Sequence, residues 1–384
     1  MTNARRWFLP GLLMLVILML VLLTTPPSSR SLRYKEGLDG LTKVERFEVG
    51  ANPFIIISPD VNSDGLPDLV VSNSGAGTLS VLTNNGQGSF GEPSVYPLGT
   101  GIFGVAAGDL NRDSHPDLVI SNERTGMLTL LLNNGSGGFS SRTDVTTGSG
   151  PHVTAVADFN GDSIADIASP DYHMNSISVI LNPGDGSFEE PVSYAVHRQP
   201  FCSVAADLNG DGAPEIATTS YTEGYVDILW NDGQGAFGIR SSMELGPELW
   251  SIAAADLTMD GLPELIVTRY TSGTITVLEN RGAGRFETSG DYPTGAGGPC
   301  WATPFELDGD GFTDLAIVDG HADTLTVLRN HGDGTFRDKV VLPTGRGPSS
   351  STAADFNGDG RDDLAVANWQ SGEIVLFATS PAEE

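Results

Sequence analysis

Basic residues are scarce in this chain of 384 residues. Lysine and arginine number 20 against 49 aspartates and glutamates, which gives a formal net charge of −29. A chain with so few cations has no basic stripe to hold phosphates, so the composition excludes a nucleic-acid-binding protein. Strongly acidic chains are often disordered, but 39% of these residues are hydrophobic and they occur in ordered short runs, which indicates a folded protein.

Cysteine and histidine are also rare. The two cysteines, Cys202 and Cys300, fall in repeats that are not neighbours in the pattern described below, so we expect buried free thiols and no disulfide. The six histidines form no His-Glu-x-x-His or paired-histidine motif, and no Gly-x-Ser-x-Gly segment is present. The sequence therefore predicts a protein that is not an enzyme, with His152 and His173 as the single enzyme-like hint.

One long apolar run, at residues 8–23, follows Arg5 and Arg6. As a helix it would be about 24 Å long, short of the roughly 30 Å hydrocarbon core of a bilayer. We expect residues 1–25 to be a signal peptide or an uncleaved N-terminal membrane anchor, and both alternatives stay open. Each places the rest of the chain outside the cytoplasm, where it is secreted, periplasmic or anchored to the membrane facing outward.

An acidic pattern of the type Asp-x-Asn-x-Asp-Gly-x-x-Asp recurs seven times. The copies, numbered here as loops one to seven, follow each other at steps of 49 or 50 residues and begin at Asp60, Asp109, Asp158, Asp207, Asp256, Glu306 and Asp355. A small-residue strand precedes each loop, and an apolar strand, an alternating strand, an Asn-Asn-Gly-x-Gly-x-Phe type of turn and a last strand follow it. Each repeat therefore predicts four antiparallel strands, the size of a propeller blade.

The repeats indicate a closed ring and not an open solenoid. The glycine-rich turn occurs six times, and the last repeat lacks a fourth strand after Phe377, whereas residues 44–49 match such a strand near the start. In a ring closed by pairing the two ends of the chain, the N-terminal strand supplies the fourth strand that the last repeat lacks. Such closure also removes exposed strand edges. We predict an all-β, seven-bladed β-propeller of four-stranded antiparallel blades over residues 44–379, closed by the N-terminal strand in the last blade. A linker at 26–43 and a tail at 380–384 flank it.

The acidic loops carry oxygen ligands at positions 1, 3, 5 and 9, and a glycine at position 6 permits the sharp turn. Calcium prefers six to eight oxygen ligands in a flexible shell. An Asx-rich turn without metal is the alternative for any one loop, but the carboxylates of seven such loops would repel each other without cations. We expect up to seven Ca²⁺ ions as cofactors. The predicted ligands are Asp60, Asn62, Asp64, Asp68, Asp109, Asn111, Asp113, Asp117, Asp158, Asn160, Asp162, Asp166, Asp207, Asn209, Asp211, Glu215, Asp256, Asp260, Glu264, Glu306, Asp308, Asp310, Asp314, Asp355, Asn357, Asp359 and Asp363.

The loops are not equal. Ser114 and Ser163 stand at position 6 of loops two and three, where we expect strain. Thr258 at position 3 predicts a weaker loop five, and loop six begins with glutamate.

These loops and turns resemble the FG-GAP/VCBS repeat family, the calcium-loop propellers of which the integrin α-subunit head is the best-known member. The similarity covers roughly residues 44–379, and a loop in every blade points to the bacterial type. The resemblance implies that the loops lie on one face of the propeller and that the opposite face binds partners.

Aromatic residues are predicted on that opposite face. The starts of the innermost strands include Phe54, Phe103 and Phe201, which we expect to plug the mouth of the channel. The predicted partner residues are Tyr172, Tyr221, Trp250, Tyr270, Trp301 and Trp369. Exposed aromatic side chains on turns are more often used for binding than for packing.

The function predicted from the sequence is a calcium-binding extracytoplasmic propeller that acts as a non-catalytic binding or adhesion module for a protein or glycan. A carbohydrate-active enzyme, a polysaccharide lyase or hydrolase on the same scaffold, is the alternative. The membrane is a further partner if the N-terminal segment is not cleaved.

Overall fold

The computed structural model describes residues 41–184, 187–295 and 297–379. The predicted signal peptide or anchor, the predicted linker up to residue 40 and the predicted tail lie outside the described residues. No helix of the described chain has the length and apolar character needed to cross a membrane.

Seven four-stranded antiparallel sheets follow one another along the described chain, and each forms one blade. The first blade consists of β2 (Pro53–Ile57), β3 (Leu69–Asn73), β4 (Thr78–Leu82) and β5 (Ser94–Pro97), and the second of β6 (Ile102–Gly108), β7 (Asp117–Asn122), β8 (Met127–Asn133) and β9 (Phe139–Thr146). The third blade consists of β10 (Ala155–Ala157), β11 (Asp166–Asp171), β12 (Ser176–Ile180) and β13 (Val192–Ala195), and the fourth of β14 (Pro200–Ala206), β15 (Glu215–Ser220), β16 (Tyr225–Trp230) and β17 (Ile239–Glu244).

The remaining blades include the one that joins the two ends of the chain. The fifth blade consists of β18 (Leu249–Ala255), β19 (Glu264–Arg269), β20 (Thr274–Asn280) and β21 (Phe286–Pro293), and the sixth of β22 (Pro299–Phe305), β23 (Asp314–Asp319), β24 (Thr324–Asn330) and β25 (Phe336–Pro343). The seventh blade consists of β26 (Pro348–Ala354), β27 (Asp363–Asn368), β28 (Glu373–Thr379) and, from the other end of the chain, β1 (Leu41–Glu48).

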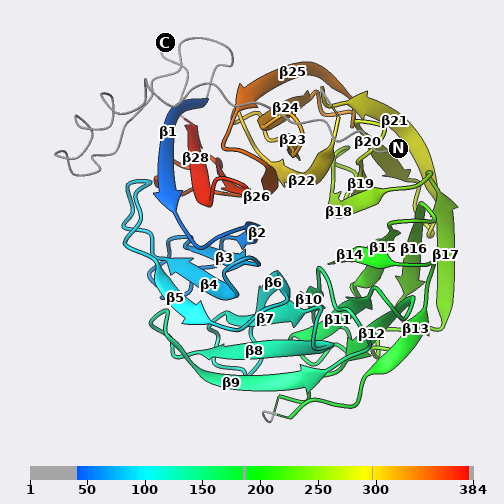
Figure 1. Ribbon diagram of the computed structural model, residues 1–384. Helices are drawn as coiled ribbons and strands as arrows, with labels where there is room; N and C mark the ends of the chain where they lie inside the picture. Colours follow the sequence, from blue (N-terminus) through cyan, green and yellow to red (C-terminus); the bar gives the residue numbers. More distant parts are fainter. Residues whose placement is uncertain (1–40, 185–186, 296, 380–384) are drawn as a thin grey trace, which may run out of the picture.

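The blades stand in a ring around a central axis, as Figure 1 shows. The innermost strands of the seven blades are β2, β6, β10, β14, β18, β22 and β26. Each contacts the innermost strands of its two neighbours, so the contacts continue around the whole ring. This arrangement confirms the predicted seven-bladed β-propeller with four-stranded antiparallel blades.

The ring closes in the seventh blade. β1 pairs antiparallel with β28, from Leu41 opposite Thr379 to Glu48 opposite Glu373. In Figure 1 the blue β1 lies beside the red β28, so the two ends of the described chain share one sheet. The closing strand predicted at residues 44–49 is thus present, and it begins at Leu41 because its partner β28 continues to Thr379.

The core lies between the blades. The second strand of every blade is wholly or almost wholly buried, whereas the outermost strands such as β5 and β13 are mainly exposed. Each apolar cluster joins side chains from adjacent blades. One example joins Ile56 and Leu69 of the first blade to Phe356 and Ile374 of the seventh. Because each sheet buries both faces of its inner strands against its neighbours, short apolar segments such as Leu69–Asn73 are sufficient to build the ring.

The two ends of each inner strand define the two faces of the propeller. β14 begins at Pro200, opposite Ser220, and ends at Ala206, opposite Glu215. The acidic loop therefore joins the first and second strands at one face, and the turn after the second strand lies at the other. We call these the loop face and the turn face.

Candidate functional sites on the two faces

An apolar side chain fixes each acidic loop to the core. The residue at position 2 is almost completely buried in all seven loops: Val61, Leu110, Phe159, Leu208, Leu257, Leu307 and Phe356. Its backbone N–H donates to the position-9 carboxylate, for example from Val61 to Asp68 Oδ2 at 3.0 Å and from Leu307 to Asp314 Oδ2 at 3.1 Å. This bond closes the loop at its base.

The oxygens at positions 1, 3 and 5 turn the loop on itself. In loop one, Asp60 accepts from the N–H groups of Asp64 and Gly65, and Asn62 Oδ1 also accepts from Asp64 N–H. Asp64 Oδ1 accepts from Leu66 N–H. Loops four and seven repeat the bonds of positions 1, 3 and 5. The turn of each of these loops is therefore fixed by hydrogen bonds within the loop itself. Among the described residues, loop six is the one loop in which three acidic ligand atoms lie within 4.8 Å of one another.

The position-9 carboxyl groups lie deeper than the sequence suggested. All seven are buried, and most accept backbone N–H bonds on both oxygens. Burial raises their pKa values, and the other carboxylates of the same loop raise them further, against the lowering effect of the hydrogen bonds. The pKa is raised in Asp68, to about 6 in Asp117, Asp166 and Asp363, and to about 7 in Glu215, Glu264 and Asp314.

Loop six has the densest group of acidic oxygens. Ligand atoms of Glu306, Asp308 and Asp314 all lie within 4.8 Å of one another, a spacing that one metal ion can bridge. The Arg329 Nε lies 3.1 Å from Asp308 Oδ2, so this loop also contains a positive charge of the protein. In loop five, Thr258 Oγ1 is buried and has no hydrogen-bond partner within the described part of the chain.

Backbone strain is present where the sequence predicted it. Ser114 and Ser163, at position 6 of loops two and three, both have φ of +66°, in the left-handed region that favours glycine. Gly65 at the same position of loop one has φ of +85°, and a Cβ there would meet nothing within 4 Å. The cost of the serines is therefore conformational and not steric.

Replacing Ser163 by glycine is expected to stabilise the protein by about 0.5–1 kcal/mol. The left-handed conformation costs an L-residue roughly 1–2 kcal/mol, and the extra freedom of glycine in the unfolded chain offsets part of the gain. Urea unfolding in saturating calcium measures the difference. Gly65→Ser is the matched reverse change and should destabilise. A Ser163→Gly variant no more stable than the parent would show that this loop stores no strain.

A repeated asparagine joins six of the seven blades to the blade before, and this role was not predicted from the sequence. The first residue of the glycine-rich turn donates its side-chain N–H to the position-2 carbonyl of the preceding blade's loop, as Asn133 does to Val61 O at 2.7 Å. The same group also donates to the position-8 carbonyl of its own loop, Pro116 O at 3.1 Å. The equivalents are Asn84, Asn182, Asn231, Asn280 and Asn330. Their constant position, 16 residues after the last loop acid, was the available signal.

The turn face gathers aromatic rings around the axis. Phe201, 5% exposed, contacts Phe103 at 5.7 Å and Trp250 at 4.9 Å between ring centroids, and Phe54 lies 4.3 Å from Phe103. These rings pack against one another across four blades, as expected for a plug at the mouth of the channel.

The predicted partner residues lie around this plug, and four of the six contact one another through their rings or through Phe201. Tyr172, Tyr221, Trp250 and Tyr270 are half-buried and form a continuous series, in which Trp250 contacts Tyr221 at 5.8 Å and stacks on Tyr270 at 5.0 Å. Phe201 links Tyr172 to the others, at 6.4 Å from Tyr172. Tyr270 Oη and His321 Nε2 share a hydrogen bond of 2.7 Å. The structure thus brings four of the six residues together.

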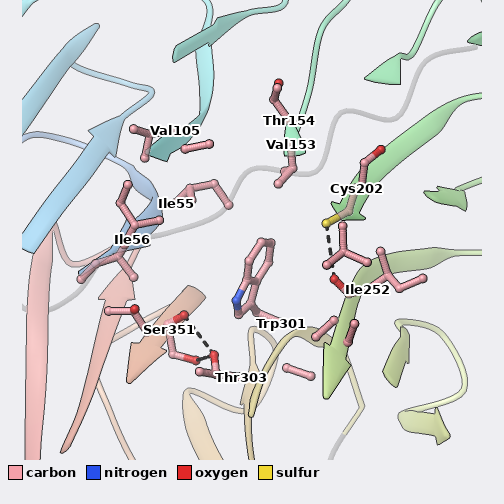
Figure 2. A pocket seen from close by; sticks show the side chains of 18 of the residues that line it. Ile55, Ile56, Val105, Val153, Thr154, Cys202, Ile252, Trp301, Thr303 and Ser351 are labelled. Atoms are coloured by element: carbon pink, nitrogen blue, oxygen red, sulfur yellow. Dashed lines mark hydrogen bonds between the residues drawn. The ribbon is translucent and has the colours of Figure 1, made fainter. Parts of the chain in front are cut away.

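Trp301 and Trp369 stand outside this series. Trp301 lines a cavity of about 390 Å³ in the central channel, together with Ile55, Val153 and Ile252 (Figure 2). Trp369 is 43% exposed, and within residues 41–184, 187–295 and 297–379 it has no aromatic partner. The sequence placed both at the turn face, but Trp301 faces the channel because it lies five residues before its acidic loop, as Ile55 and Val153 do, whereas the equivalent of Trp250 in this strand is Cys300.

The two cysteines are buried free thiols in separate blades, as predicted. Burial raises the pKa of each to about 12, so neither is a reactive thiolate at neutral pH.

The acidic loops mark the starts of a sequence repeat that is known from other proteins. The sequence profile described as FG-GAP-like repeat matches residues 60–120, 109–169, 158–218, 207–267 and 306–366, and each match begins at position 1 of a loop. The chain belongs to the FG-GAP-like repeat family. No match begins at loop five of this FG-GAP-like protein, the loop in which threonine replaces the position-3 asparagine.

Solved structures with similar folds have different activities. Virginiamycin B lyase from Staphylococcus aureus is 13% identical, with a TM-score of 0.62 over 88% of this chain and 99% of the lyase. An Agrocybe aegerita lectin that recognises non-reducing terminal N-acetylglucosamine is 21% identical, with a TM-score of 0.56 over 85% of each chain. BBS1N, solved in complex with ARL6DN, is 12% identical, with a TM-score of 0.63 over 92% of this chain and 99% of BBS1N. These similarities concern the fold alone, and no curated protein gave a significant match.

Proposed function

We propose that this FG-GAP-like propeller is an extracytoplasmic, calcium-binding module that binds a protein or a glycan and catalyses no reaction. The observation that carries the proposal is the aromatic series Tyr172, Tyr221, Trp250 and Tyr270 on the turn face. Its half-buried rings are held in place by Phe201 and leave part of their surface to solvent. Rings fixed in this way present a large contact area at little cost in side-chain entropy.

The donor chemistry of the acidic loops supports calcium. Carboxylate, amide and backbone oxygens are the ligands that Ca²⁺ prefers, and the loops contain no sulfur or imidazole at the predicted positions. Burial raises the pKa values of the position-9 carboxyl groups, and the other carboxylates of the same loop add a smaller increase. A divalent cation bound in the loop would offset this cost of holding the carboxylates charged. In loop five, the buried and unpartnered Thr258 Oγ1 stands where a ligand oxygen is needed. The residues therefore fit the ion.

An extracytoplasmic location follows from this chemistry. Calcium loops of extracellular modules typically bind in the range of about 10⁻⁴ to 10⁻³ M, so they fill outside the cell. The apolar segment at residues 8–23 provides the export signal or anchor for this proposal, and an uncleaved anchor would add the membrane as a partner.

Replacing Tyr221 or Tyr270 by alanine is expected to abolish binding at the turn face. Each change removes a ring from the series, and because both rings are partly exposed the loss in stability should stay near 1 kcal/mol. Ligands are first sought with the full chain in calcium, on a glycan array and by pull-down from cell surfaces. Binding of the variants is then measured for each ligand found.

Tyr225→Ala is the matched control. Tyr225 is also half-buried and stacks on a single ring, that of His197 at 3.8 Å, but it lies on β16 and outside the aromatic series. If the ligand still binds both Tyr221→Ala and Tyr270→Ala, the turn face is not the binding site.

A carbohydrate-active enzyme, a polysaccharide lyase or hydrolase, is the second candidate. It is favoured by one observation, the approach of His152 and His173 to the same carboxylate, that of Glu123. The glycans that bind in the array would serve as substrates for a turnover assay. Turnover that persists through purification and disappears in His173→Ala would favour the enzyme over the binding module.

A further inference from the structure

His152 is buried in a way that hydrogen bonding does not explain. The residue is 4% exposed, and neither of its ring nitrogens has a hydrogen-bond partner among the described residues. Its ring stacks between Phe103 at 4.2 Å and Tyr172 at 4.6 Å, with Phe201 against its edge at 4.8 Å. Buried polar atoms without partners are rare in folded proteins and point to a ligand, an ion or water.

Two more ligand atoms lie beside the buried ring, at the boundary between the second and third blades. Glu123 Oε1 is 3.7 Å from His152 Nε2, and the same oxygen is 3.7 Å from His173 Nε2. These distances exceed a hydrogen bond. They are close to the roughly 3.3 Å that separates neighbouring ligand atoms around a tetrahedral zinc ion with bonds of about 2.0–2.1 Å.

The backbone fixes all three residues at the turn face. The N–H groups of Glu123, His152 and His173 donate to Gly101 O, Pro170 O and Ser149 O. His173 also packs over Gly150, where a Cβ would lie 2.6 Å from the imidazole. The ligands therefore start from defined positions, which lowers the entropy lost on binding an ion.

We propose that His152, His173 and Glu123 form a binding site for a divalent transition-metal ion such as Zn²⁺, separate from the acidic loops. Two imidazoles and one carboxylate are a common ligand set for such ions, and imidazole is not a calcium ligand. Three protein ligands leave a fourth position for water or for a donor atom of a bound molecule, at the edge of the aromatic series.

Binding requires one movement. Glu306, Asp308 and Asp314 are the single described group with three ligand atoms within 4.8 Å of one another, so the two imidazole nitrogens of the proposed site, each 3.7 Å from Glu123 Oε1, lie more than 4.8 Å apart. The His173 side chain is 51% exposed, so it can rotate toward Glu123, and the rotation changes its contacts with Gly150 and with the ring of Tyr172.

The test is titration of the full chain with ZnCl₂ by isothermal calorimetry, in millimolar calcium so that the acidic loops are occupied. We expect one equivalent of Zn²⁺ to bind, and Co²⁺ to give the visible absorption of a four-coordinate site with nitrogen ligands. His173→Ala and Glu123→Gln should each weaken Zn²⁺ binding by at least about tenfold and abolish the Co²⁺ band. Both changes lie at partly exposed positions, so the variants should fold, which circular dichroism checks.

The matched control is His331→Ala. His331 Nε2 lies 3.3 Å from Asp338 Oδ2, which makes a surface histidine–carboxylate pair without a buried imidazole. The proposal is overturned if the folded wild type binds no Zn²⁺ at micromolar concentrations, if both site variants keep the full affinity, or if His331→Ala loses as much. None of these results bears on calcium binding or on Tyr221 and Tyr270, so the test is independent of the proposed function.

Discussion

Removing calcium with EGTA is expected to lower the melting temperature of the full chain by on the order of 10 °C. A ligand that binds the folded state at ten times its Kd stabilises that state by about 1.4 kcal/mol, so seven independent sites contribute about 10 kcal/mol. Dividing this free energy by the unfolding entropy of a domain of this size, roughly 2.1 cal/mol/K per residue, gives the expected shift in melting temperature. Differential scanning calorimetry with and without EGTA measures it.

The controls separate calcium from other effects of the chelator. Adding calcium in excess over EGTA should restore the melting temperature, and magnesium should restore it much less because it demands stricter octahedral geometry. Asp359→Ala removes the position-5 ligand of loop seven and should reduce the shift, since one site is lost. Melting curves that coincide in calcium and in EGTA would refute calcium binding by the acidic loops.

Replacing Asn133 by alanine is expected to destabilise the protein by about 2–3 kcal/mol. The Asn133 side chain is buried and donates to Val61 O of the preceding blade and to Pro116 O of its own loop. Alanine leaves two buried carbonyl groups unpaired, each at a cost of roughly 1–3 kcal/mol, partly recovered if water enters. Urea unfolding in saturating calcium gives the difference in free energy.

The next residue provides the control. Asn134 is exposed and accepts hydrogen bonds within its own turn, from Ser136 and Gly138. Asn134→Ala should cost less than about 1 kcal/mol, because solvent replaces those bonds. Equal effects of the two substitutions would mean that the bond between blades contributes nothing beyond the turn itself.

Patterns of residues that are close in the sequence were sufficient to predict most of the fold. The 49-residue period of the acidic loops gave the number of blades, and the alternating segments gave four strands in each. The unpaired strand predicted at residues 44–49 then required closure of the ring, which the pairing of β1 with β28 confirms. The strain predicted at Ser114 and Ser163 is also present, since the conformation at position 6 depends on the loop alone.

Contacts between blades were beyond the reach of the sequence. Asn133 was read as part of a turn, because its partner Val61 is 72 residues away and its bond depends on how two sheets pack. Trp301 was placed on the turn face as if it were the equivalent of Trp250, but the strand pairing gives that position to Cys300, and Trp301 one residue further along faces the channel.

The sequence by itself determined the propeller, the closing strand and the chemistry of the acidic loops. These features depend on periodicity and on residues within a few positions of each other, which the order of amino acids states directly. Only the tertiary structure decided that the position-9 carboxyl groups are buried under backbone hydrogen bonds and that six asparagines connect neighbouring blades. It also enclosed His152 between Phe103 and Tyr172, within reach of Glu123. The position-9 carboxyl groups are paired when the loop and the third strand of one blade come together. The asparagine bonds and the enclosure of His152 arise where separate blades meet, at an angle and distance set by the closed ring.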